Sequence, residues 1–300
     1  MSDGARGARP VAGSPWSAAR RRLRRNRVAL AAGRVVGLVA LVSALAPAIA
    51  PHDPAEIDAK RTLEPPGARA LFGRDHLGRD VLSRVVYGGR LSLRVGLVSV
   101  AISLGFGLTL GVLAGFYAGW PDTLIMRTMD SLLAFPGILL ALAVIAVLGP
   151  GLSNVMVAVG VSYVPHYTRV VRSSVLSAKV SPYVDAARAV GCRDARLVLA
   201  HILPNALTPV IALATLGVAT AILVAAGLSF LGLGAQPPTP EWGAMVSSGR
   251  EYLRSAWWIS TFPGLMIMLT VLAINLLGDG LREALDPVAR RAQLPASQAS

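Results

Sequence analysis

The polar side chains best suited to chemistry lie together in residues 181–204, a segment that stands among long apolar runs. Asp185 occupies its first half, and Arg188, Arg193 and Arg196 follow. Carboxylate and guanidinium groups form strong charge-assisted hydrogen bonds. These side chains are therefore available for ionic contacts on the polar side of the segment.

The residues around these charges predict two short helices separated by a turn. Ser181 is suited to cap a helix that begins at Pro182, where the missing amide hydrogen costs nothing. Gly191 is expected to end that helix, Asp194 to cap a second one, and Pro204 to close the segment. The apolar face of the first helix is expected to contain Tyr183, Ala186, Ala187 and Val190. An amphipathic helix lying on the membrane surface is the alternative interpretation.

The lysines bear on whether the chain can hydrolyse ATP itself. A P-loop needs a Lys that follows Gly and precedes Ser or Thr. Lys60 and Lys179, the two lysines of the sequence, each follow an alanine. The chain is therefore expected to lack ATPase activity, and the energy of any ATP-driven process must come from another subunit.

The remaining reactive side chains predict no enzyme. The four histidines fall on separate segments, so neither a metal site nor a Ser-His-Asp assembly is visible. Cys192 is the single cysteine, which excludes an intramolecular disulfide. No catalytic residue, metal or cofactor is predicted.

An ion-coupled carrier or a channel that works without an ATPase is the competing class. Ion coupling needs carboxylates that face a cavity within the bilayer. None of the predicted hydrocarbon spans holds Asp or Glu, and Asp130 is expected at a helix start, where it caps the helix or faces water.

Residues 181–204 also resemble the cytoplasmic EAA loop of ABC-importer permeases, whose signature is Glu-Ala-Ala, then Gly, then Ile-x-Leu-Pro. The match is carried by Asp185, Ala186, Ala187, Gly191, Leu203 and Pro204. Asp185 stands where the family has Glu, and His201 where it has Ile. The resemblance implies that this loop docks on a separate ATPase subunit, with Asp185 in a polar contact, Gly191 at the bend and Leu203-Pro204 as a hinge.

Two further stretches indicate which group of ABC-importer permeases the chain resembles. Residues 72–93 look like the segment that precedes the transport core in dipeptide, oligopeptide and nickel permeases, and residues 278–287 are similar to that family's closing segment. The closest resemblance is to the shorter, C-type permease subunit. It implies a heterodimer with a second homologous permease, two cytoplasmic ATPase subunits and an extracytoplasmic solute-binding protein. Di- or oligopeptides are the expected substrates, with nickel or another small solute as the alternative.

Hydropathy predicts the elements that must position the loop. Single spans are expected at residues 28–50, 95–116, 206–231 and 259–278. The charge-free run 131–168 is too long for one span and is split by Gly149-Pro150-Gly151, which predicts a hairpin of two more. A glycine at every fourth position predicts a close helix contact through Gly107, Gly111, Gly115 and Gly119. Trp257 and Trp258 are expected to anchor the last span at the interface.

Charge sets the expected topology. Residues 1–27 carry eight arginines and read as a cytoplasmic basic tail, followed by the first transmembrane helix at 28–50. Residues 51–92 form an extracytoplasmic loop with an amphipathic segment that lies flat at the interface. Residues 93–278 form a five-helix permease core that includes the coupling loop, and residues 279–300 form a second cytoplasmic tail. A cleavable signal peptide ending at Ala50 is the alternative for the first span, but Pro51 and the span's length favour an uncleaved anchor.

Composition agrees with this plan. The 300 residues are 54% hydrophobic and 15% charged, which is the balance of a polytopic membrane protein. The net charge of +13 is explained by arginines beside the spans, so lipid rather than nucleic acid is the expected partner. The predicted fold is all-α, with six transmembrane helices and a cytoplasmic coupling helix-turn-helix. The expected location is the bacterial cytoplasmic membrane, with both termini cytoplasmic.

Overall fold

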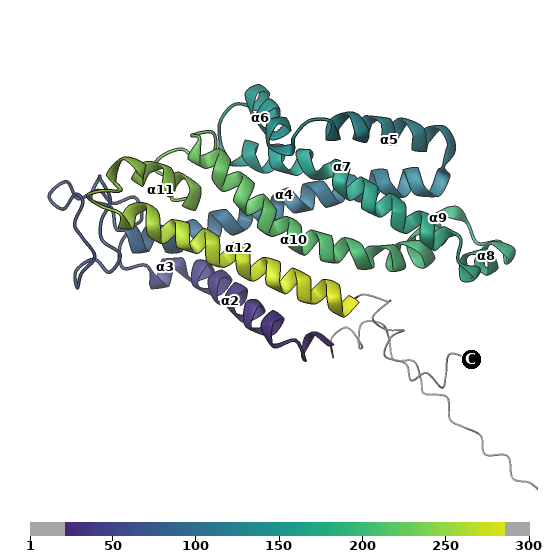
Figure 1. Ribbon diagram of the computed structural model, residues 1–300, viewed down its shortest axis with the longest axis horizontal. Helices are drawn as coiled ribbons and strands as arrows, with labels where there is room; N and C mark the ends of the chain where they lie inside the picture. The colour runs from purple at the N-terminus through teal and green to yellow at the C-terminus, as the bar shows by residue number, and fades with distance from the viewer. Residues whose placement is uncertain (1–21, 286–300) are drawn as a thin grey trace, which may run out of the picture.

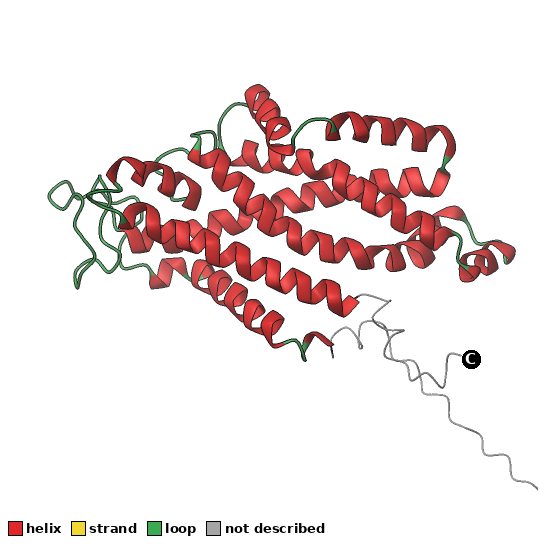
Figure 2. Ribbon diagram, viewed as in Figure 1, coloured by secondary structure: helices red, strands yellow, loops and turns green. Residues whose placement is uncertain are grey.

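The structure, a computed structural model, describes residues 22–285. Within that range the chain forms helices, turns and two isolated β-bridges but no strand (Figure 2). The all-α class is thus confirmed. The helices are α2 (Arg27–Ala44), α3 (Ala46–Ile49), α4 (Val81–Tyr117), α5 (Gly119–Leu133), α6 (Gly137–Leu148), α7 (Leu152–Lys179), α8 (Pro182–Ala189), α9 (Asp194–Arg196), η1 (Leu197–Ile202), α10 (Leu203–Phe230), α11 (Trp242–Gly249), η2 (Arg250–Tyr252) and α12 (Trp258–Leu285).

The long helices lie side by side along the longest dimension of the molecule (Figure 1). Residues 51–80 and α11 gather at one end, which we call the loop end, and residues 181–204, which we call the knuckle, project from the other, the knuckle end. The first turn of α2 meets the last turns of α12, where Asn26 Nδ2 donates to Glu283 Oε2 at 3.2 Å. Both ends of the described chain therefore point toward the knuckle end.

Helices α4 and α7 run in the same direction. Ser103 Oγ donates to the Gly160 carbonyl at 2.7 Å near the middle of the pair, and Lys179 Nζ donates to the Phe116 carbonyl at 2.5 Å at the knuckle end. The chain must therefore return between them, and it does so through α5 and α6. These two helices are bent by 94° at a short break that contains Pro136.

Four helical segments are long and apolar enough to cross a membrane, and the bent pair α5–α6 would make a fifth. The four are Arg27–Ala44, Val81–Tyr117, Asp194–Phe230 and Trp258–Leu285. Helix α7 has 28 residues but is less apolar. It is packed between α4, α10 and α6, so fewer of its side chains need to suit lipid. The expected number of six spans is therefore approximate and depends on counting α7.

The glycines of α4 bring it close to α7. The glycines that face α7 are Gly107, Gly111 and Gly115. A Cβ on Gly111 would stand 2.6 Å from Val171 Cβ and 2.7 Å from the Thr168 carbonyl oxygen, closer than real atoms approach. Gly119 differs from the expectation. It starts α5 with φ +67° in open space and does not belong to this contact, because α4 ends at Tyr117.

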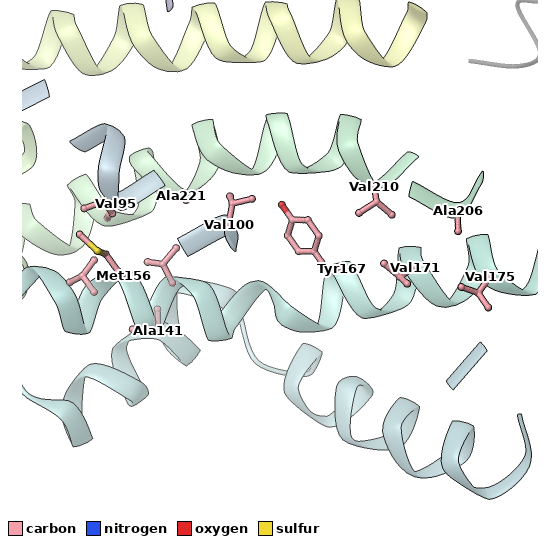
Figure 3. Packing of buried hydrophobic residues seen from close by; sticks show 14 of the residues in the cluster. Val95, Val100, Ala141, Met156, Tyr167, Val171, Val175, Ala206, Val210 and Ala221 are labelled. Atoms are coloured by element: carbon pink, nitrogen blue, oxygen red, sulfur yellow. The ribbon is translucent and has the colours of Figure 1, made fainter. Parts of the chain in front are cut away.

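The main core lies where α7 meets its neighbours. Val95 and Val100 of α4, Ala141 of α6 and Val210 of α10 surround the side chains of α7 (Figure 3). The buried knuckle residues Val184, Leu197 and Ile202 belong to the same cluster. The knuckle is thus continuous with the core of the bundle.

The amphipathic segment expected before the second span does not form a separate interfacial helix. Residues 72–80 are a folded loop, and residues 81–92 are the first turns of α4, which continues without a break to Tyr117. The loop buries its charges: Arg74, Asp75, Arg79 and Asp80 are each at most 5% exposed. This arrangement depends on burial of the charges by residues that are distant in the sequence, which local periodicity cannot predict.

Trp258 is also not an interfacial anchor. It is 5% exposed, and its Nε1 donates to the Arg74 carbonyl at 3.0 Å, whereas Trp257 is 50% exposed. The last helix continues to Leu285, seven residues beyond the expected end of the span. Residues 1–21 of the expected basic tail and residues 286–300 of the second tail lie outside the described part of the chain.

Candidate functional site

The knuckle begins with the expected helix. Ser181 is the residue before α8 and has an extended backbone (φ −82°, ψ 141°), and Pro182 is the first helical residue. The Ser181 hydroxyl makes no capping hydrogen bond, but its carbonyl accepts from the Val184 amide at 2.9 Å. The start of α8 is therefore fixed by backbone geometry and by proline rather than by a side-chain cap.

Gly191 makes the turn after α8. Its φ is +78°, a conformation that glycine adopts without cost. The Gly191 amide donates to the Arg188 carbonyl at 2.9 Å, and the Cys192 amide donates to the Ala187 carbonyl at 3.1 Å. These two bonds form a Schellman motif, which satisfies carbonyls that the helix end would leave unpaired.

The second half of the knuckle is more continuous than the sequence suggests. Asp194 is the first residue of α9 and not its cap, a place taken by Arg193. Pro204 does not close the segment, since it lies within a helical rod that runs from Asp194 to Phe230. A π-helical turn at Leu197–Ile202 immediately precedes Leu203 and Pro204. Such turns accommodate irregular backbone pairing inside a helix, which explains why the proline does not stop it.

Most of the apolar face expected on α8 is exposed, and a different residue packs on the core. Val184 is fully buried, whereas Tyr183 is 41% and Val190 84% exposed. Ala186 is exposed and Ala187 half-buried. Apolar side chains that remain outside a core are a docking surface when they gather in one place.

Ala186, Ala187 and Val190 border a concavity of about 850 Å³ between α8 and the rod. Its lining residues are Ala186, Ala187, Val190, Gly191, Cys192, Arg193, Arg196 and His201. Asp185 lies on the exposed side of α8, and its Oδ1 is 3.6 Å from an Arg188 guanidinium nitrogen. An exposed pair of this kind is worth little and leaves the carboxylate available.

A polar contact that the sequence did not indicate holds α8 against α10. Asn205 Nδ2 donates to the Tyr183 hydroxyl at 3.0 Å and to the His201 carbonyl at 3.0 Å. The two side chains are 22 residues apart, so no helical periodicity connects them. The sequence offered only the presence of two polar residues on either side of the turn.

The arrangement presents apolar and cationic side chains at the surface of the knuckle. It combines a concavity lined by apolar and basic side chains with buried contacts of Val184, Leu197 and Ile202 to the core. Within residues 22–285 no group of three or more His, Cys, Asp or Glu side chains could hold a metal ion. The knuckle therefore combines exposed apolar and charged side chains with buried contacts to the core of the bundle.

Comparison with known proteins places the chain among transport proteins. The family described as "Binding-protein-dependent transport system inner membrane component" matches residues 107–291, and "N-terminal TM domain of oligopeptide transport permease C" matches residues 14–66. The dipeptide transport system permease protein DppC of Alkalihalophilus pseudofirmus is 48% identical over 91% of this chain and 90% of its own length. The glutathione transport system permease protein GsiD of Pectobacterium atrosepticum is 46% identical over 91% of each chain.

The fold has relatives among solved structures. The MetNI methionine ABC transporter in an inward-facing conformation matches with a TM-score of 0.56 at 20% identity, over 68% of this chain and 97% of that chain. The crystal structure of an amino acid ABC transporter with histidines matches with a TM-score of 0.53 at 12% identity, over 67% of this chain and 94% of that chain. At these identities the likeness shows a shared fold.

Proposed function

Because this chain belongs to the family of binding-protein-dependent transport system inner membrane components, we propose that it is the permease subunit of a peptide importer driven by separate ATPase subunits. Two relatives at 46–48% identity are named for the transport of dipeptides and of glutathione, which supports short peptides as substrates. Nickel or another small solute is the alternative substrate. The complete importer would contain a second homologous permease, two ATPase subunits and an extracytoplasmic binding protein.

The observation that carries this proposal is the construction of the knuckle. Val184, Leu197 and Ile202 anchor it in the same core that joins α4, α7 and α10, while Val190 and Asp185 remain exposed. A force applied to the exposed side would therefore reach the bundle without being absorbed by a flexible loop. Asp185, Ala186 and Ala187 would contact the ATPase, Gly191 would hold the bend, and Leu203-Pro204 would lead into α10.

Sidedness follows from this role, because ATPase subunits are cytoplasmic. The knuckle end, and with it both termini, would face the cytoplasm, and the loop end would receive the binding protein. Cys192, the single cysteine, is half-buried in the knuckle and serves as a natural probe. We expect a membrane-impermeant maleimide to label it in inside-out vesicles and not in intact cells. Labelling in intact cells would place the knuckle outside and exclude the proposed motor contact.

Substitution at Gly191 tests the docking role. Gly191→Val should uncouple ATP hydrolysis from uptake, because a β-branched residue at φ +78° costs about 1–2 kcal/mol and would shift the end of α8. We expect peptide uptake to fall about tenfold or more with normal membrane insertion. Gly191→Asn is the matched control, since Asn tolerates this backbone region and open space surrounds the site. Unchanged uptake in Gly191→Val would contradict the assignment.

Reconstitution separates the proposal from the competing class. An ion-coupled carrier or channel would transport its substrate when this chain alone is placed in proteoliposomes. We propose instead that uptake requires ATP and the partner subunits. Transport by the isolated chain under an ion gradient would favour the carrier.

A further inference from the structure

An exposed ion pair joins α5 to α7. Arg169 Nη2 donates to Asp130 Oδ1 at 2.6 Å, and the two side chains are 54% and 50% exposed. The sequence placed Asp130 at a helix start, ahead of a span beginning at 131. In the structure it lies inside α5, which starts eleven positions earlier, at Gly119. Asp130 is therefore a carboxylate within the bent crossing and not a cap.

Both helices place this pair at the same depth. Asp130 lies eleven residues beyond the first residue of α5, and Arg169 lies ten residues before the last residue of α7. At a rise of about 1.5 Å per residue, each residue lies about 15 Å along its helix from the end of that helix nearest the knuckle. On the neighbouring helix α4 this level falls between Gly107, which faces Tyr167 and Thr168, and Gly111, which faces Val171, within the apolar run 95–116 that is expected to cross the membrane. Charged side chains at that depth face water or protein and not lipid.

The surroundings of the pair are polar as well. Exposed polar residues flank it at helical spacing, and we define the polar face as Arg127, Asp130 and Ser131 of α5 with His166, Arg169 and Ser173 of α7. Large apolar side chains are exposed elsewhere on the bundle, as at Phe106 of α4 (60% exposed) and Val147 of α6 (85%). Lipid suits those apolar positions, and the polar face requires a different environment.

The neighbouring ion pair between Arg172 and Asp122 is closed by two hydrogen bonds and less exposed, as expected of a contact that only joins two helices. Arg172 binds Asp122 with two hydrogen bonds, Nε to Oδ1 at 2.5 Å and Nη2 to Oδ2 at 2.6 Å, and the side chains are 30% and 18% exposed. Arg169 and Asp130 share one bond and leave about half of each side chain open. A guanidinium has five donors and a carboxylate about four acceptor sites, so both can bind a further group.

We infer that the polar face borders the water-filled route of the substrate, and that Arg169 and Asp130 bind the carboxylate and the ammonium group of a zwitterionic peptide as it passes. One positive and one negative group, held side by side and half open, are complementary to the two ends of a short peptide. A second permease packed on this face would instead have to bury two charges. The inference rests on the proposed function. The experiments below give different results when the substrate contact is wrong and when the proposed function is wrong.

Cysteine accessibility tests the water-filled route. His166→Cys and Ser173→Cys are made in a Cys192→Ser background, assembled with the partner subunits and treated with a charged methanethiosulfonate reagent. We expect both to react at least about tenfold faster than Val147→Cys, and saturating dipeptide with its binding protein to slow the reaction. Rates equal to that of Val147→Cys would overturn the aqueous route. Fast reaction that peptide does not slow would overturn the substrate contact.

Transport kinetics test the two charges. Arg169→Gln and Asp130→Asn should each raise the KM for a zwitterionic dipeptide by about tenfold or more. The charge-swapped double variant, Arg169→Asp with Asp130→Arg, keeps an ion pair between α5 and α7 and should not restore the KM. A normal KM in the single variants, or a KM restored by the charge-swapped double variant, would mean that the pair only joins the two helices and does not bind the peptide. Absence of ATP-dependent peptide uptake by the unmodified complex would instead overturn the proposed function itself.

Discussion

Replacing Asp75 by Asn is expected to destabilise the loop end by about 3–5 kcal/mol, the usual cost of leaving a buried charge without its partner. Asp75 is 2% exposed and lies at the centre of the folded loop before α4. Its Oδ2 accepts from Arg79 Nε at 2.6 Å, and Arg84 Nε is 3.8 Å away. Both arginines are 5% exposed, so water cannot solvate the guanidinium charges that would lose their carboxylate partner.

The rest of the Asp75 side chain would survive the change, which isolates the effect of charge. Oδ1 accepts from the amides of Leu77 and Arg79, each at 2.9 Å, and an Asn carbonyl oxygen can do the same. We expect the melting temperature of the detergent-purified chain to fall by about 10 °C. Asp53→Asn is the control, because Asp53 is exposed and in the same loop. Equal melting temperatures for the two variants would show that the buried network does not stabilise the loop end.

Replacing Gly111 by Leu should separate α4 from α7 and prevent normal assembly of the bundle. The first atom of the new side chain would already stand 2.6 Å from Val171 Cβ, and three more carbons would follow. Overpacking a close contact costs about 1–3 kcal/mol or more, and here the obstacle includes the Thr168 carbonyl, which cannot rotate away.

Gly105→Leu provides the matched control for Gly111→Leu. Gly105 lies on the same helix and is exposed, and no neighbouring atom lies within 4 Å of the position that a Cβ would take there. We expect the yield of membrane-inserted, detergent-stable protein to collapse for Gly111→Leu and to stay near normal for Gly105→Leu. Similar yields for both would mean that the contact between α4 and α7 does not depend on the absence of a side chain at Gly111.

The knuckle shows how far local sequence reached. Pro182 and Gly191 set the limits of α8, because a proline at the first helical position and a left-handed glycine after the last one act through their own backbone. Local sequence did not determine which side of α8 is buried. Val184 is buried and Tyr183 is exposed because the core of α7 and α10 lies on one side of the helix.

The sequence by itself determined the helical class, most of the apolar crossings and the position of the knuckle, because hydropathy and backbone preference act within a few residues. Only the tertiary structure decided which charges are buried and which polar residues meet. Asp130 lies 39 residues from Arg169, and Trp258 lies 184 residues from the Arg74 carbonyl that it binds. The cost of burying a charge depends on such distant partners, and no periodicity in the chain records where they will be.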